Sequence, residues 1–227
     1  MPRALREADR LSYGVLVGFR AVAVSVALLV GSPTLAGAAP ADALNAPAER
    51  RSGIVLSLAG VGGFGSGSGY PNSVSKIDRP EAYSSSGWLP GYGMSLCVMG
   101  ALADALNFGG WFATTTFENG AWKSTGLGGG LRLELFPLYP FGIKDLGVAA
   151  SFGVGQTTVR ANSGVPDPAE GTQSTIRFGA FYEWSLLRFL GGHVSVGPLV
   201  EYETIFARSI TRNALLGGAR VVFYGGP

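Results

Sequence analysis

The sequence has very few of the side chains that form disulfides, metal sites and catalytic bases. Its 227 residues include one cysteine, Cys97, and one histidine, His193. One cysteine excludes an intramolecular disulfide and a metal site built from several thiolates. One histidine leaves a single candidate for Ser–His or Asp–His chemistry, and it falls at a predicted turn rather than beside the long loops. We therefore expect no catalytic residues, no cofactor and no metal site, and a protein that is not an enzyme.

Charge is also scarce. Charged residues make up 14% of the chain, against about 25% in a typical soluble domain. Residues 1–38 hold four arginines against Glu7 and Asp9, a net charge of +2, which is the net charge of the whole chain. The remaining residues are therefore neutral overall. Nucleic-acid binding loses its electrostatic basis, and no nucleic-acid partner is expected.

Long apolar runs are missing apart from one near the start. Ala21–Gly31 is almost wholly apolar, follows an arginine-bearing segment and precedes small residues at Ala36 and Ala38. This order is typical of a secretory signal peptide, here residues 1–38, with cleavage between Ala38 and Ala43. The alternative of an uncleaved membrane anchor needs about 20 apolar residues. Residues 39–51 are expected to form a disordered lead-in, and any later membrane crossing has to use strands.

Glycine, in contrast, is abundant. It accounts for 36 of 227 residues, roughly twice the usual share, which disfavours helices and suits strands and turns. After residue 51, apolar residues recur at every second position, the period of a strand whose two faces meet different surroundings. The sequence predicts eight strands, at about 53–62, 91–102, 106–117, 122–138, 146–160, 174–189, 193–206 and 214–224.

The last of these strands shows the two faces clearly. Leu215, Val221 and Phe223 lie on one face with small residues, and Arg220 lies on the other. Other strands also carry charges in mid-strand on the face opposite the apolar one, which suits the narrow lumen of an eight-stranded barrel. Because unpaired buried charges are costly, these side chains are expected to form a structural lumen charge network. Its members are Arg132, Glu134, Arg177, Glu183, Glu201, Glu203 and Arg220.

Two further expectations concern the seventh strand, 193–206, and its neighbour, 214–224. Arg220 is expected to pair with Glu201 or Glu203, because their strands are neighbours in the barrel. Pro198 lies inside this strand on its apolar face and has no N–H to donate to the sheet. A local β-bulge at Pro198 is expected to absorb the lost hydrogen bond.

The alternation alone leaves open which face points inward, because a soluble lipocalin-like barrel has the same period with the faces exchanged. The central charges, the aromatic residues near strand ends and the aromatic final strand favour lipid on the apolar face. An even number of strands returns the chain to the side on which it started. The long segments 62–88 and 161–173 are expected to be loops that share the outer side if the N-terminus is periplasmic.

With this leader, strand pattern and final strand, the chain resembles the small eight-stranded outer-membrane barrels of Gram-negative bacteria, the OmpA/OmpX type. The expected fold is all-β, an eight-stranded antiparallel up-and-down transmembrane β-barrel over residues 52–226, preceded by a cleaved signal peptide. The resemblance implies a location in the bacterial outer membrane and contact with its lipid and lipopolysaccharide. It also implies recognition of the C-terminal strand by the barrel-assembly machinery. A monomer is expected.

Four functions are compatible with the pattern. The leading one is a non-enzymatic outer-membrane barrel with a structural, adhesive or envelope-integrity role and a closed, salt-bridged lumen. The alternatives are a lipid A-modifying outer-membrane enzyme, a narrow pore and a soluble periplasmic ligand-binding barrel. The absence of a matched catalytic motif and the near balance of lumen charges favour the first.

Overall fold

The computed structural model describes residues 51–226, so the predicted signal peptide and residues 39–50 of the predicted lead-in lie outside the described residues. Within this range no helix is long and apolar enough to cross a membrane. Two short 3₁₀ helices, η2 (Pro80–Ala82) and η3 (Tyr139–Phe141), lie in links. The strands are β1 (Ile54–Gly69), β2 (Ser84–Ala103), β3 (Leu106–Glu118), β4 (Trp122–Leu135), β5 (Leu146–Ala161), β6 (Ala169–Tyr182), β7 (Trp184–Phe189), β8 (Gly192–Phe206) and β9 (Ile210–Gly225).

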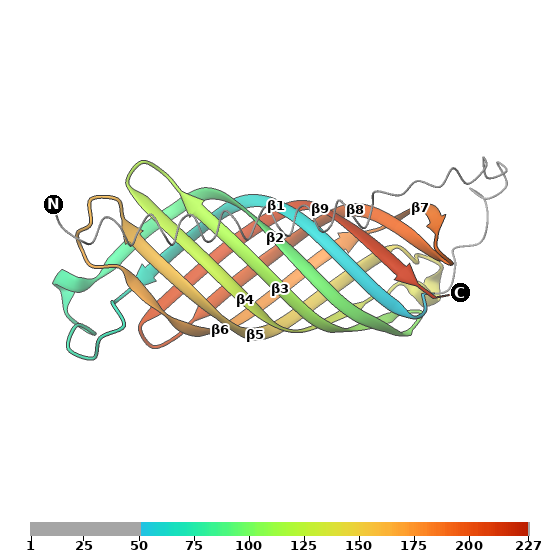
Figure 1. Ribbon diagram of the computed structural model, residues 1–227, viewed down its shortest axis with the longest axis horizontal. Helices are drawn as coiled ribbons and strands as arrows, with labels where there is room; N and C mark the ends of the chain where they lie inside the picture. Colours follow the sequence, from blue (N-terminus) through green and yellow to red (C-terminus); the bar gives the residue numbers. More distant parts are fainter. Residues whose placement is uncertain (1–50, 227) are drawn as a thin grey trace. The chain divides into compact units, whose positions relative to one another are not determined.

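The strands form one closed antiparallel barrel (Figure 1). Each strand from β1 to β6 pairs with its neighbour in sequence, β1 also pairs with β9, and pairing between β6 and β8 closes the ring. The strands β6 and β7 both pair with β8, one after the other, and so take a single place in the ring. The predicted eight-stranded up-and-down barrel is therefore confirmed, with its sixth strand interrupted at Glu183.

The interruption at Glu183 lies opposite Gly197, next to Pro198, which faces Tyr182. The pairs Phe181–Leu199 and Trp184–Val196 keep the same register, so no residue is inserted at Pro198. The expected β-bulge at that position is wrong: the partner strand breaks instead, because Pro198 has no N–H to offer it. The Glu183 N–H donates to the carbonyl of Asp145 on its other side, at 3.0 Å. A register shift does occur further on, at Leu186 within β7.

The apolar face of the barrel points outward. Leu56, Val98, Phe152 and Val200 are exposed, whereas residues of the opposite parity, such as Cys97, are buried in the lumen. This is the reverse of a soluble ligand-binding barrel, which keeps its apolar face inside. The orientation predicted from the mid-strand charges and the aromatic strand ends is the one that the structure has.

Strands extend further than predicted at one end of the barrel. The strand β1 continues to Gly69 and β2 begins at Ser84, so the predicted loop 62–88 shrinks to residues 70–83. Glycine hides the alternation there, because it has no side chain to mark either face. Its absence of a side chain also makes room in the lumen: a Cβ on Gly65 would lie 2.6 Å from the Phe117 ring, and one on Gly67 would lie 2.5 Å from Val159.

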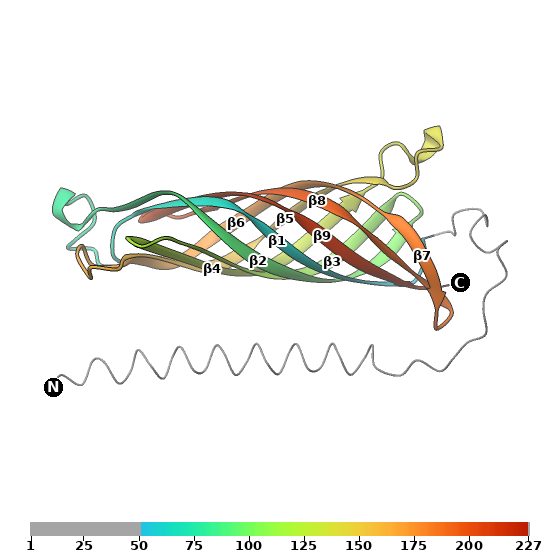
Figure 2. The ribbon, with the colours of Figure 1, turned by 90° about the horizontal axis from the view of Figure 1, so that it is seen from above.

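The two ends of the barrel differ. We call the end that holds Ile54 and Gly225 the terminal end, and the opposite end the loop end (Figure 2). Links 70–83, 119–121, 162–168 and 207–209 lie at the loop end. Links 104–105, 136–145 and 190–191 lie at the terminal end, so the long link 136–145 does not share the side of the two predicted long loops.

Candidate functional site in the barrel lumen

The structure places all seven residues of the predicted lumen charge network inside the barrel. Each has at most 5% of its side chain exposed, although they come from four strands and from Glu183 between β6 and β7. Their positions follow the period of two: Arg132 and Glu134 lie two residues apart on β4, and Glu201 and Glu203 lie two apart on β8. Each pair therefore projects from one face of its strand into the lumen.

The buried charges form a single alternating chain. Nine side chains of the described residues take part, five arginines and four glutamates, and every glutamate lies between two arginines. We call this set the lumen charge chain. From the terminal end it runs Arg51–Glu183 (3.7 Å), Glu183–Arg220 (3.3 Å), Arg220–Glu134 (2.9 Å), Glu134–Arg132 (2.9 Å), Arg132–Glu201 (2.7 Å), Glu201–Arg177 (3.6 Å), Arg177–Glu203 (2.8 Å) and Glu203–Arg212 (2.6 Å).

The expected pairing of Arg220 with Glu201 or Glu203 is wrong. In the β8–β9 ladder Arg220 faces Gly197, whereas Glu201 faces Leu216, four residues further along. At about 3.3 Å per residue the two side chains start roughly 13 Å apart. Arg220 instead reaches across the lumen to β4, where both of its terminal nitrogens donate to Glu134, at 2.9 and 3.1 Å.

Two members of the lumen charge chain were missed from the sequence. Arg212 falls where a turn was predicted, but β9 already begins at Ile210. Its even number places it on the same face as Arg220, so extending the alternation by one more step would have found it. Arg51 belongs to the predicted lead-in, and no periodic signal marks it. With Arg51 and Arg212 included, the lumen charge chain carries a formal charge of +1.

Aromatic rings support four of the five arginines. The guanidinium of Arg51 lies 3.5 Å above the Phe136 ring, and that of Arg220 lies 4.0 Å from the Phe181 ring. Trp111 and Phe117 take the same role for Arg177 and Arg212, at 5.2 and 4.8 Å. A cation over an aromatic face is attracted by the ring quadrupole, most strongly where water is excluded.

Glycines on the lumen wall give these large side chains their space. A Cβ on Gly126 would lie 2.4 Å from a guanidinium nitrogen of Arg212, and one on Gly147 would lie 2.2 Å from the Phe181 ring. A Cβ on Gly179 would lie 2.8 Å from the Glu201 side chain. The high glycine content therefore has a packing role, because an eight-stranded barrel holds little more than its own side chains.

Apolar side chains occupy the lumen at the loop end, beyond Arg212. They come from the loop-side parts of five strands, and each is at most 2% exposed. The members of this apolar cap are Leu89, Phe117, Val159, Ala169 and Ile210. The loop end of the lumen thus holds these apolar side chains together with buried uncharged polar residues, in place of the ion pairs.

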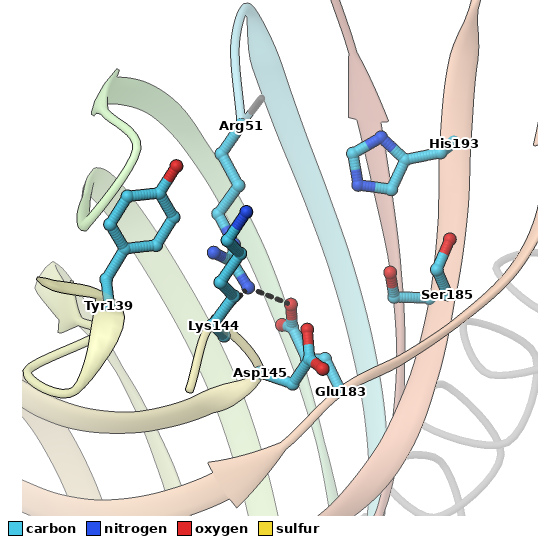
Figure 3. Close-up of a pocket in the computed structure, with 8 residues that line it drawn as sticks. Arg51, Tyr139, Lys144, Asp145, Glu183, Ser185 and His193 are labelled. Atoms are coloured by element: carbon cyan, nitrogen blue, oxygen red, sulfur yellow. Dashed lines mark hydrogen bonds and ion pairs between the residues drawn. The ribbon is translucent and has the colours of Figure 1, made fainter. Parts of the chain in front are cut away.

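The terminal end holds a small polar cavity of about 30 Å³ (Figure 3). It lies between the link 136–145, which contributes Tyr139 and Lys144, and the β7–β8 hairpin, which contributes His193. Arg51 enters it from the chain before β1 and meets Glu183, as the dashed line in Figure 3 shows. At about 10–15 Å³ for each water molecule, this space suits about two waters and no larger molecule.

His193 and Cys97 also lie in the terminal half. The imidazole of His193 stacks on the Tyr224 ring, with centroids 4.7 Å apart, and the Tyr224 hydroxyl donates to Glu183 at 2.8 Å. Cys97 is buried among lumen residues. Among the described residues there is no group of three or more His, Cys, Asp or Glu side chains placed to hold a metal ion.

Several solved structures that are similar to this chain are outer-membrane barrels. Ail, the attachment invasion locus protein of Yersinia pestis, in complex with the heparin analogue sucrose octasulfate, is 12% identical, with a TM-score of 0.41, over 75% of this chain and 99% of Ail. Neisserial surface protein A is 11% identical, with a TM-score of 0.38, over 75% of this chain and 97% of its own. OprG from Pseudomonas aeruginosa is 13% identical, with a TM-score of 0.37, over 77% of this chain and 98% of its own.

No protein-family model and no curated protein matches the sequence. The closed antiparallel barrel with eight strand positions that the resemblance implies is the one that the strand pairing shows.

Arg51 offers a test of how far the lumen charge chain extends beyond the strands. Its guanidinium donates to the carbonyls of Lys144 (2.7 Å) and Asp104 (3.3 Å) in addition to meeting Glu183. The Arg51→Ala substitution is expected to lower the free energy of unfolding by about 2 kcal/mol, because it removes charged hydrogen bonds and the contact of the guanidinium with the Phe136 ring. It should also speed amide exchange in the link 136–145, measured by mass spectrometry.

The control for Arg51 is Arg79→Ala, which removes an exposed arginine from the link 70–83 and should change neither quantity. Arg51→Lys keeps the charge but loses the planar group that stacks and donates in a fork, so it should fall between the two. Equal stability of Arg51→Ala and Arg79→Ala would show that Arg51 does not stabilise the terminal end of the barrel.

Proposed function

We propose that this protein is an exported, integral outer-membrane β-barrel of Gram-negative bacteria with a closed lumen and a non-enzymatic structural or adhesive role. The lumen charge chain carries this proposal. It fills the interior with ion-paired side chains, and the cavity at its terminal end has room for only about two water molecules. The seven lumen residues predicted from the sequence, together with Arg51 and Arg212, act in it as structural residues.

The outer surface supports insertion in a membrane. Apolar side chains point outward along every strand from β1 to β6 and along β8 and β9. A surface of this kind is unfavourable in water and suits the hydrocarbon core of a bilayer, where a closed barrel satisfies its backbone hydrogen bonds. Lipid and lipopolysaccharide are therefore the proposed surroundings. Export by the signal peptide 1–38, recognition of β9 by the barrel-assembly machinery and a monomeric state belong to the same proposal.

The loop end supports a role in contacts outside the membrane. Lys76 of link 70–83 forms an ion pair with Asp167 of link 162–168, and the Ser84 hydroxyl donates to the Asp167 carbonyl at 3.2 Å. The rings of Tyr70 and Tyr83 lie 5.1 Å apart. The two long links thus form a joined surface over the apolar cap, which we propose as the adhesive or structural contact face.

A lipid A-modifying enzyme has less support. Such chemistry acts on lipid in the outer leaflet, which the loop end reaches under this proposal. The single histidine, His193, is the second residue of β8, at the terminal end, and is buried against Tyr224. A narrow pore has less support as well, because the lumen charge chain and the apolar cap follow one another along the axis.

Four measurements test the proposal: gel mobility, bilayer conductance, solubility without detergent and the lipid A mass spectrum. The protein extracted from membranes should run faster on a denaturing gel before boiling than after it, as folded outer-membrane barrels do. In planar bilayers it should give no channel openings above background. Solubility without detergent would overturn the membrane assignment, and stepwise conductance of the wild-type protein would overturn the closed lumen. A change in the lipid A mass spectrum that depends on His193 would overturn the non-enzymatic role.

A further inference from the structure

The outward face of β3 to β6 contains an apolar groove of about 360 Å³. Its walls include three phenylalanines, Phe108, Phe152 and Phe178, with Leu133 and Ile176. Ala150 also lines the groove and has the smallest side chain among its lining residues. In the ladders Phe108 pairs with Leu133, Leu133 with Ala150, and Ala150 with Phe178, so one small side chain interrupts a row of large ones across four strands.

We propose that this groove is a binding site for one acyl chain of a phospholipid in the leaflet at the terminal end. The inference rests on the proposed outer-membrane location, because the groove faces acyl chains only if the barrel spans a bilayer. It goes beyond that location by naming a discrete site. A recess between rings holds a chain by close contact on several sides, whereas a smooth barrel wall touches it on one.

The depth of the groove fits an acyl chain rather than a headgroup. Ala150 lies four residues from Leu146, which pairs with Tyr182 at the terminal rim. Four residues span about 13 Å along the strand. With a strand tilt near 45°, the groove lies about 9 Å below that rim, within the half-thickness of about 15 Å of a hydrocarbon core.

The rim above the groove has the residues of a membrane interface. The rings of Tyr182 and Trp184 lie 5.2 Å apart, and the Tyr182 hydroxyl donates to Asp145 at 3.5 Å. Trp184 is exposed on the outer side. Tyrosine and tryptophan rings prefer the headgroup level of a bilayer. A phospholipid whose ester groups lie beside this pair therefore has its tail at the depth of Ala150.

A substitution that fills the groove tests the site. The wild-type protein, Ala150→Phe and Ala180→Phe are each assembled in nanodiscs of phosphatidylethanolamine and phosphatidylglycerol, transferred to detergent and examined by native mass spectrometry. Ala180 is the matched control, because it is an exposed alanine on β6 that faces Val148, one row nearer the rim and outside the groove. Wild type and Ala180→Phe should each retain one phospholipid. Ala150→Phe should retain it about tenfold less often, because the added ring fills the recess and removes the close contacts that the acyl chain makes there.

Three outcomes would overturn the site: no lipid retained by the wild type, equal retention by Ala150→Phe and wild type, or equal loss in both variants. A cross-linked dimer of the Ala150→Cys variant would assign the groove to a second copy of the chain instead. Heat-dependent gel mobility is recorded for every variant. If mobility is normal while lipid retention fails, the acyl-chain site is wrong and the outer-membrane barrel stands; if the mobility change is absent, the membrane assignment itself is wrong.

Discussion

Neutralising Glu134 should lower the free energy of unfolding by about 3–5 kcal/mol, the range for removing one partner of a buried ion pair. Glu134 is fully buried and accepts hydrogen bonds from both Arg132 and Arg220. In Glu134→Gln both guanidinium groups keep their positive charge in a lumen that already carries an excess of +1. The measurement is a urea titration of the protein in phospholipid vesicles, followed by tryptophan fluorescence.

A surface pair provides the control for Glu134. Glu118 and Lys123 form an ion pair at 2.8 Å near the loop end, with side chains that are 50% and 33% exposed. Because water screens exposed pairs, Glu118→Gln should cost less than about 1 kcal/mol. Equal effects of the two substitutions would mean that the lumen charge chain is solvated and does not hold the barrel together.

A double variant separates the loss of a charge from the loss of a contact. Glu134→Leu combined with Arg220→Met removes one charge of each sign and leaves the excess lumen charge unchanged. Replacing a buried ion pair by apolar groups of similar size is often neutral or stabilising. The double variant should therefore recover more than half of the stability lost in Glu134→Gln. If it is less stable than the single variant, pairing geometry rather than charge balance governs the lumen.

Removing the Phe181 ring should have an effect of similar size. Phe181 is 3% exposed, lies against Arg220 and meets Phe136 edge-on with ring centroids 5.5 Å apart. Phe181→Ala is expected to lower the free energy of unfolding by about 3–5 kcal/mol. The substitution removes the free energy gained by burying the ring and also leaves a cavity. The same urea titration measures it.

The neighbouring Phe178 isolates the contribution of the lumen. It lies on the same strand, faces outward and is 57% exposed. In Phe178→Ala lipid can fill the space, so only the favourable transfer of the ring from water to lipid is lost, about 2 kcal/mol. Phe181→Ala should exceed this by about 1–3 kcal/mol, from the cavity and the lost ring contacts. Equal losses would show that the lumen at Phe181 is wet and loosely packed.

Together these side chains explain why the interior of the barrel is so polar. A ring of eight strands needs inward side chains that fill a narrow space, and small residues alone would leave it open to water. Arginine reaches furthest across the lumen, and an aromatic ring or glutamate meets it on the far side. The result is a lumen that is charged along most of its length and still closed, in line with the proposed non-conducting role.

The sequence by itself determined the strands and their two faces. The period of two between Leu131, Leu133 and Leu135 on one side and Arg132 and Glu134 on the other is a local property, set by the pleat of the strand. Lipid on one face and a narrow lumen on the other explain why the alternation is so regular. Where glycine replaces both kinds of residue, as around Gly65, the pattern vanishes, and the ends of β1 and β2 could not be predicted.

Only the tertiary structure decided which charges meet. Arg220 and Glu134 are 86 residues apart in the chain and lie on strands that are not neighbours in the barrel. Their contact depends on the stagger of the strands around the ring and on the reach of an arginine across it, and neither is written in the alternation of a single strand. For the same reason no local signal marked Arg51: it has no strand of its own, and its place is set by the carbonyls, the ring and the carboxylate that closure of the barrel brings to the terminal end.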